Sequence, residues 1–345
     1  MGHLLMLKKV VIRNDLNSGI RYKLGSSGPN LLCLPRLEHL STVFSHVRGE
    51  LIADANLPAL RTLELTDHIS NPSTTKELLA KTPKLERFSY FLVEDTDSLL
   101  EFLRWGDDYG IGDTAHEDEW SAFATNLGGV AATLRVLKIY VDFTPPAYPE
   151  NVEGSQEAWE WVNHASDRRG AIGSLTHLHN LTKLEIPMHV LFAYRPHGIR
   201  LRDILPPSLR KLYLRDDSAY SGDIYDAPPK LVIPALQSYL LESEPDGKVL
   251  SLQELHFKLR TSDMASLFRK MDVQDGLQID EQHPLRRLES VARQAGVRCM
   301  VRFRVQHASF LSPEHEYPFV YNQPNSRRAI CIRFLFCCSS STNCA

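Results

Sequence analysis

The sequence lacks any long apolar segment. No stretch reaches the ~18 uninterrupted apolar residues that a membrane-spanning helix requires. The apolar start at residues 4–7 ends at Lys8 and Lys9, which is too early for the core of a signal peptide. We therefore expect an intracellular protein, cytoplasmic or nuclear, with no membrane partner.

The sequence also lacks an excess of charge of one sign. It holds 39 Lys and Arg residues against 42 Asp and Glu residues, which gives a formal net charge of −3. A protein that binds nucleic acid over a broad surface normally shows a basic excess. We therefore expect no nucleic-acid partner.

Catalytic signatures are missing as well. The sequence contains no G-x-S-x-G, no H-E-x-x-H and no dinucleotide-binding glycine motif. The glycine run at 25–28 lacks the Lys that follows in a phosphate-binding loop. The sequence thus predicts a protein that is not an enzyme and has no cofactor. An enzyme of unrecognised type is the alternative, because ordinary His, Asp and Ser residues are present.

Metal-ligand patterns are incomplete. His177 and His179 lie two apart but have no third ligand nearby, and the acidic segment 105–120 lacks the D-x-D-x-D-G arrangement that wraps calcium. Four of the six cysteines crowd the C-terminal end without a C-x-x-C pair. We expect no metal site. Segment 105–120 is interpreted as a solvated loop, with calcium binding and partner contact as alternatives.

What the sequence does contain is a repeat. The pattern L-x-x-L-x-L, with other apolar residues allowed, occurs eight times. Its copies begin at Leu7, Leu37, Leu60, Leu85, Leu134, Leu181, Leu209 and Leu252.

The spacing within each copy predicts a strand. The last two apolar residues are two apart, so in a strand they face the same side, and a single strand cannot bury that side alone. Stacking of successive copies would create a continuous core. We therefore expect burial in adjacent parallel strands of one curved sheet for Leu63, Leu65, Leu137, Ile139, Leu184, Ile186, Leu212 and Leu214.

Helical patterns lie between the repeat copies. Segments 74–81, 97–105 and 264–271 place apolar residues at helical spacing. Together with the strands they predict an α/β fold in which helices connect parallel neighbours.

The C-terminal part has a different pattern. Pro284 opens a helical pattern that ends at Gly296, and residues 297–306 alternate apolar and polar side chains as a strand does. We interpret 284–306 as the cap of a domain covering 1–306. Residues 307–345 are predicted to form a weakly ordered tail.

With these repeats, the chain resembles the leucine-rich-repeat family, specifically the irregular type found in fungal and animal F-box/LRR proteins. The resemblance rests on the L-x-x-L-x-L segments and covers roughly residues 4–306. It implies a solenoid with a curved parallel sheet and return helices. It also implies a non-catalytic protein-recognition module, the substrate-recognition part of a ubiquitin-ligase receptor.

One departure from the F-box/LRR pattern affects the expected partners. An F-box would precede the repeats, whereas the first repeat here begins near residue 7. We therefore expect no binding of an F-box adaptor by this chain alone. A leucine-rich-repeat scaffold unrelated to ubiquitination is the alternative function.

The predicted recognition surface consists of the positions beside the second apolar residue of each copy, which would line the concave face. Lys138, Lys183 and Lys211 would form a basic stripe with Arg87, favouring an acidic or phosphorylated partner. The alternative is that these side chains only keep the sheet soluble. The candidate protein-binding residues are Arg87, Lys138, Lys183, Lys211, Tyr213 and His256.

Overall fold

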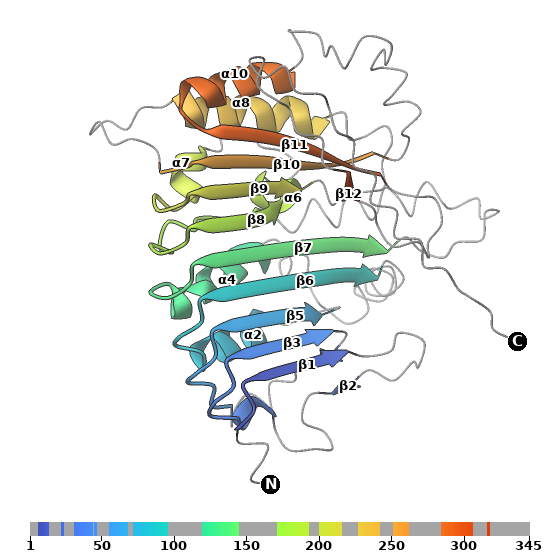
Figure 1. The fold of residues 1–345 in the computed structure, drawn as a ribbon, viewed down its shortest axis with the longest axis vertical. Coiled ribbons are helices and arrows are strands. Elements are labelled where there is room, and N and C mark those ends of the chain that lie inside the picture. The colour runs from blue at the N-terminus through green and yellow to red at the C-terminus, as the bar shows by residue number, and fades with distance from the viewer. Residues whose placement is uncertain are drawn as a thin grey trace, which may run out of the picture.

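One sheet runs the length of the molecule (Figure 1). The computed structural model describes residues 6–13, 22–23, 31–43, 45–46, 55–67, 72–95, 119–144, 171–192, 200–215, 227–241, 251–261, 284–305 and 316–317. Within these ranges nine parallel strands follow one another in chain order, and a two-residue strand pairs antiparallel with the last of them. The predicted α/β class with a parallel sheet is therefore confirmed.

The strands of this sheet lie in the order β1-β3-β5-β6-β7-β8-β9-β10-β11-β12. Their bounds are β1 Lys9–Arg13, β3 His39–Val43, β5 Thr62–Asp67, β6 Arg87–Asp95, β7 Val136–Thr144, β8 Lys183–Pro187, β9 Lys211–Arg215, β10 Glu254–Thr261, β11 Arg298–Val305 and β12 Glu316–Tyr317. A separate pair is formed by β2 Tyr22–Lys23 and β4 Ser45–His46. Because each parallel strand neighbours the next one in the chain, the arrangement is solenoid-like.

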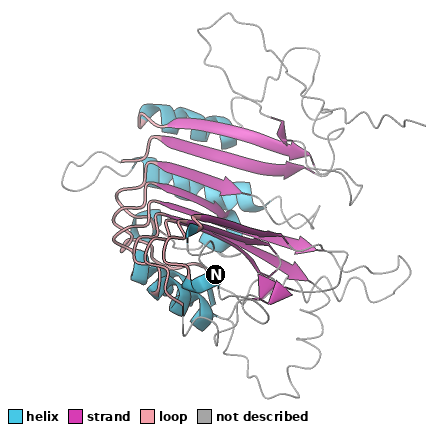
Figure 2. Ribbon diagram, turned by 60° about the horizontal axis from the view of Figure 1, so that its bottom comes forward, coloured by secondary structure: helices cyan, strands magenta, loops and turns pink. Residues whose placement is uncertain are grey.

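The described helices lie on one side of the sheet (Figures 1 and 2). Their bounds are α2 Pro72–Ala80, α4 Glu119–Asn126, α6 Met188–Phe192, α7 Leu201–Ile204, α8 Ala227–Leu241 and α10 Pro284–Gln294, with 3-10 turns η3 Leu31–Cys33 and η4 Leu127–Val130. None of the helices in the described ranges is long and apolar enough to span a bilayer.

The strands from β3 to β10 in the main sheet are entered through the same backbone pattern. The carbonyl oxygen of Lys8 accepts hydrogen bonds from the backbone N–H groups of Glu38 and His39, at 2.8 and 2.9 Å. The same pair of hydrogen bonds recurs at each step as far as the entry of β10. The accepting residues, here called entry residues, are Lys8, Glu38, Arg61, Glu86, Arg135, Thr182 and Arg210.

A tight turn precedes the entry residue in several copies. The N–H of Leu37 donates to the carbonyl oxygen of Leu34, and the N–H of Leu60 donates to that of Leu57, both at 3.2 Å. The turn directs the first apolar residue of the copy into the core, where both Leu37 and Leu60 are fully buried. The repeat therefore begins three residues earlier than L-x-x-L-x-L suggests.

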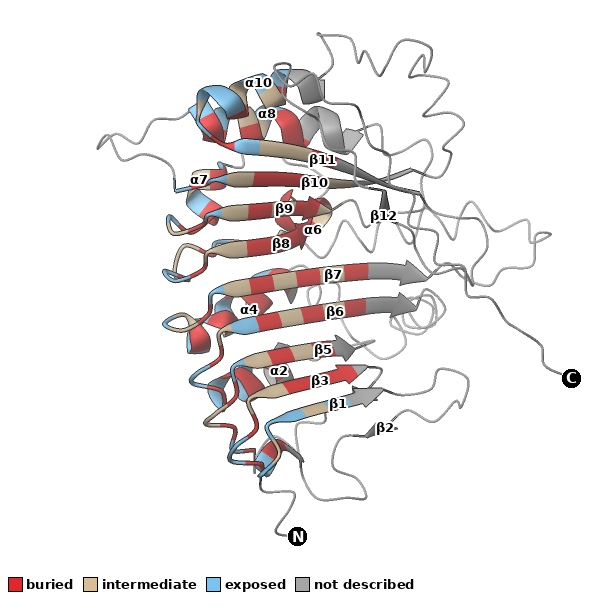
Figure 3. Cartoon of the chain, viewed as in Figure 1, coloured by how far each residue is buried: buried red, intermediate tan, exposed pale blue. Residues whose placement is uncertain are grey.

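The core lies between the sheet and the helices. Along the strands, buried residues alternate with partly exposed ones (Figure 3). The predicted core positions are confirmed: seven are 0% exposed and Leu65 is 6% exposed. They all belong to one cluster of buried side chains that extends from Leu32 to Val301.

The two helix predictions that fall on described residues are confirmed with small shifts. The helix expected at 74–81 is α2, and the one ending at Gly296 is α10. Gly296 has φ +72°, the left-handed conformation that suits glycine after a helix. The strand expected at 297–306 is β11. The helices expected at 97–105 and 264–271 lie outside the described residues.

Helix α8 and the C-terminal segment 307–345 remain to be compared with the sequence predictions. Helix α8 was not predicted; Pro228 and Pro229 lie in its first turn, where proline is tolerated, and Pro234 lies inside it. Of the predicted tail, 307–345, the structure describes only Glu316–Tyr317, which pairs with β11.

Candidate functional site

The sheet face opposite the helices, here called the outward face, carries polar side chains in straight rows. Because the parallel strands are in register, equivalent positions of successive strands stand beside one another. Row A contains Arg87, Val136, Lys183, Lys211, Glu254 and Arg298. Row B contains Ser89, Lys138, Glu185, Tyr213, His256 and Met300.

A third row follows near the ends of the strands. Row C contains Phe91 and Tyr140 on β6 and β7, and Pro187, Arg215 and Lys258 on β8, β9 and β10. Strand β8 ends at Pro187. The guanidinium carbon of Arg215 lies 4.3 Å from the ring centroid of Tyr140, so the arginine spans the width of β8.

Glu185 anchors one ion-pair network on this face. Its Oε1 accepts hydrogen bonds from Lys258 Nζ at 2.7 Å and from Arg215 Nη1 at 3.3 Å. The Glu185 side chain is 4% exposed. Burial raises the pKa of Glu185, but the hydrogen bonds and charges of Lys258 and Arg215 outweigh burial, so the pKa lies below its ordinary value. The carboxylate is therefore ionised at neutral pH.

Glu254 anchors a second network beside the first. Its Oε1 lies 2.6 Å from Arg298 Nη2 and 3.2 Å from Lys211 Nζ, while its Oε2 lies 3.1 Å from His256 Nε2. Burial raises the pKa of Glu254, but the hydrogen bonds from His256 and Lys211 and the Arg298 charge lower it overall. Both carboxylates of this region thus hold cations in place.

Aromatic rings fill the space between the charged groups. The rings of Tyr213 and His256 are stacked with centroids 4.1 Å apart. Lys183 Nζ lies 4.4 Å from the Tyr213 centroid, a cation–π contact. These contacts restrict the rotamers of Lys183 and Tyr213, so the surface is preorganised.

Around Lys183 there are more lysine side chains than carboxylates. The pKa of Lys183 is lowered, first by burial and then by the charges of Lys138, Lys258 and Lys211, against the opposing effect of Glu185. Among the described residues, no carboxylate forms an ion pair with Lys138 or Lys183. Among the described side chains of β7–β11, four cations therefore pair with two carboxylates and two lysines pair with none; the paired cations are Lys211, Arg215, Lys258 and Arg298, and the unpaired ones are Lys138 and Lys183.

The structure brings together most of the candidate residues proposed from the sequence. Lys183, Lys211, Tyr213 and His256 are linked by the contacts above, and Lys138 lies close enough to affect the pKa of Lys183. Arg87 is separated from Lys183 in row A by Val136, so the predicted stripe is interrupted there.

Sequence reasoning missed three cations of this cluster. Arg215 and Lys258 follow the last apolar residue of their copies, and Arg298 begins the strand of the cap. The alternation of period 2 continues past the six-residue pattern, and following it further would have revealed row C.

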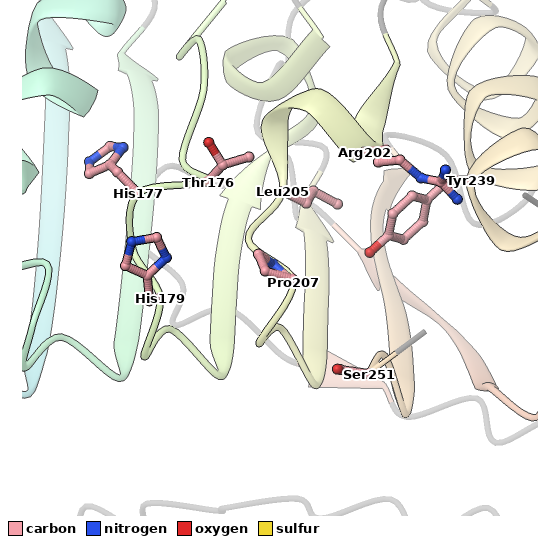
Figure 4. Close-up of a pocket in the computed structure, with 8 residues that line it drawn as sticks. All are labelled: Thr176, His177, His179, Arg202, Leu205, Pro207, Tyr239 and Ser251. Carbon is pink, nitrogen blue, oxygen red and sulfur yellow. The ribbon is translucent and has the colours of Figure 1, made fainter. Parts of the chain in front are cut away.

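A groove of about 580 Å³ lies near the amino-terminal ends of β8, β9 and β10 (Figure 4). Its lining residues include no carboxylate; they are Thr176, His177, His179, Arg202, Leu205, Pro207, Tyr239 and Ser251. The two imidazoles lie on one side, and Arg202 and Tyr239 lie on the other (Figure 4). His177 Nε2 is buried without a hydrogen-bond partner. The lining residues supply hydrogen-bond donors, but they do not form a recognisable catalytic triad or acid–base pair.

Among the described residues, no group of three His, Cys, Asp or Glu side chains is placed to hold a metal ion. The terminal cysteines and most of segment 105–120 lie outside the described residues. In comparisons with known proteins, no family model and no curated protein matched this chain.

Proposed function

We propose that the chain is a leucine-rich-repeat-like recognition module that binds another protein through its outward face over β7–β11. It acts without catalysis, as the substrate-recognition part of an F-box/LRR receptor does. The observation that carries the proposal is the cluster of six described cations around Glu185 and Glu254, four of them paired with these carboxylates, in register across five strands.

The repeated strand entry supports the leucine-rich-repeat part of the proposal. Seven successive entry residues accept the same pair of backbone hydrogen bonds, so each copy of L-x-x-L-x-L builds the same local structure. Repeats of this kind form rigid, extended surfaces that suit protein recognition.

The contacts on the outward face support binding rather than solubility alone. Side chains that serve only solubility are normally mobile and well hydrated. Here Glu185 and His256 are 3% exposed although they occupy outward positions. Ordered polar side chains lose little conformational entropy when a partner binds.

A double charge reversal tests the site. Lys138→Glu with Lys183→Glu changes two cations that form no described ion pair, so the networks at Glu185 and Glu254 keep their partners. We expect partner recovery from cell extract to fall at least about tenfold, since loss of about 1.4 kcal/mol is sufficient for that. Circular dichroism and a thermal melt check that the variant is folded.

The matched control is Lys76→Glu with Lys81→Glu, which makes the same change in net charge on the helix side, where both lysines are exposed. This control should recover the partner as the wild type does. Equal recovery by both double variants and the wild type would exclude the outward face as the binding surface. Segment 105–120 would then be the next candidate for the binding surface.

A further inference from the structure

We infer that the outward face binds a phosphorylated segment of its partner, and that Lys138 and Lys183 hold the phosphate group. This inference rests on the proposed function and names the chemistry of the ligand. It is carried by the geometry of the cation cluster over β7–β10.

The ion pairs of the other four cations indicate where the phosphate binds. Arg215 and Lys258 are bound to Glu185, and Lys211 and Arg298 are bound to Glu254. Lys138 on β7 and Lys183 on β8 lie at the β7–β8 side of these networks and form no ion pair with a described carboxylate. The positive charge of these two lysines is therefore not compensated by a carboxylate. An anion that approaches the outward face is attracted to them.

Crowding around Lys183 favours an anion of high charge. Burial lowers the pKa of Lys183 most. The charges of Lys138, Lys258 and Lys211 lower it further, against the opposing charge of Glu185, so lysine–lysine repulsion is present in the free protein. A phosphate ester carries a charge of about −1.5 to −2 near neutral pH, against −1 for a carboxylate. It relieves more of this repulsion than Asp or Glu does.

The spacing of the strands also fits a phosphate. Lys138 on β7 and Lys183 on β8 are diagonal neighbours on adjacent strands about 4.8 Å apart, because Lys138 stands beside Glu185 and Lys183 beside Val136. Flexible lysine side chains from adjacent strands can converge on one group with several acceptor oxygens. A single carboxylate offers fewer oxygens to the same donors.

The aromatic contacts disfavour single-stranded nucleic acid. Base recognition without sequence preference requires open aromatic faces on which bases stack. The ring of Tyr213 is stacked on His256 and contacted by Lys183, and Arg215 covers the ring of Tyr140. Base stacking would have to displace these contacts, whereas a phosphate group on a peptide leaves them in place.

Degenerate peptide libraries provide the test. The purified full chain is titrated with a library that has a fixed phosphoserine and with matched libraries that have a fixed Ser or Glu. Single-stranded RNA of similar length is the fourth probe. We expect at least about tenfold tighter binding of the phosphoserine library than of the Ser library, with weaker binding at high salt. The Glu library should fall between them.

Neutral variants assign the effect to the two lysines. Lys138→Gln with Lys183→Gln should remove the preference for phosphoserine, while Lys76→Gln with Lys81→Gln should retain it. Circular dichroism establishes that both variants are folded. Equal binding of the phosphoserine and Ser libraries would overturn the inference, as would preference retained in the Lys138/Lys183 variant or tighter binding of the RNA.

A second arm separates this inference from the proposed function. The cell extract is treated with phosphatase before partner capture. If recovery depends on Lys138 and Lys183 but does not change after phosphatase treatment, the outward face binds a protein and the phosphate inference is wrong. If charge reversal at these lysines leaves recovery unchanged, the proposed function itself fails.

Discussion

Glu185 shows how an outward position becomes part of the interior. Its row places it among solvent-facing residues, and the sequence predicts an exposed side chain there. Instead, Lys258 and Arg215 close over its carboxylate and leave it 4% exposed. The charge is tolerated because two cations donate hydrogen bonds to one oxygen of the carboxylate.

Removal of this carboxylate is expected to destabilise the protein. Glu185→Ala leaves Lys258 and Arg215 without their shared partner, and breaking a buried pair in this way costs about 3 kcal/mol. Urea unfolding at neutral pH measures the difference. The matched control is Glu64→Ala, at the equivalent row position on β5, where the side chain is more exposed. A cost at Glu185 no larger than that at Glu64 would contradict the buried network.

The same network predicts a pH dependence. The pKa of Glu185 in the folded protein lies below its ordinary value, which is about 4.3 in the unfolded chain. Its contribution to stability is therefore complete above about pH 4.3 and is lost as the pH falls through the lower folded pKa. Unfolding in urea should show a large difference between wild type and Glu185→Gln at pH 7. By pH 3 that difference should have begun to shrink; a constant difference would argue against the ionised network.

At the scale of the strand, the apolar pair of each repeat carries the stability. Leu184 on β8 is fully buried, and its truncation to Ala should cost on the order of 2–5 kcal/mol through lost burial and a remaining cavity. Urea or thermal unfolding provides the measurement. Thr62→Ala, on the outward face of β5, is the control and should change stability by about 0.5 kcal/mol or less. Similar costs at both positions would mean that the core does not lie behind β8.

The sequence predicts the strands well because their signal is local. An apolar pair two residues apart specifies both a strand and the face that it buries, and Leu212 and Leu214 on β9 follow this rule. Helix α8 was missed for an equally physical reason. Its tertiary packing, with Val232, Ile233 and Leu236 buried, overrides the unfavourable Pro234 inside the helix.

The candidate site was only partly predictable. Period 2 identifies which side chains share a face, so Lys138, Lys183 and Lys211 could be named from the sequence. Register between strands that are distant in the chain, however, depends on the strand entries. The partnership of Glu185 with Lys258, 73 residues later, is a product of that register and has no local signal.

Across the whole molecule, the first strand is expected to be the least protected. β1 has β3 on one side, and the apolar residues of its repeat copy, Leu7 and Val10, are only partly buried, whereas Leu37 and Leu40 in the next copy are buried. In a repeat array each unit is stabilised mainly by its neighbours, so a terminal strand opens most readily.

Hydrogen exchange measures this gradient. Peptides covering residues 9–13 should exchange faster than those covering the first half of β6, which is hydrogen-bonded to strands on both sides. The β3 peptide serves as an internal control with intermediate protection. Slower exchange at β1 than at β6 would contradict a stability gradient along the array.

The uniform strand entry also bears on how such a sequence can evolve. Leu37 and Leu60, which open successive copies, are 23 residues apart, whereas Leu85 and Leu134 are 49 apart. Both intervals lead into the next strand through the same two backbone hydrogen bonds. Insertions and deletions in the return segments therefore leave the spacing of rows A, B and C unchanged. Selection can alter the length of those segments and the composition of the recognition surface independently of one another.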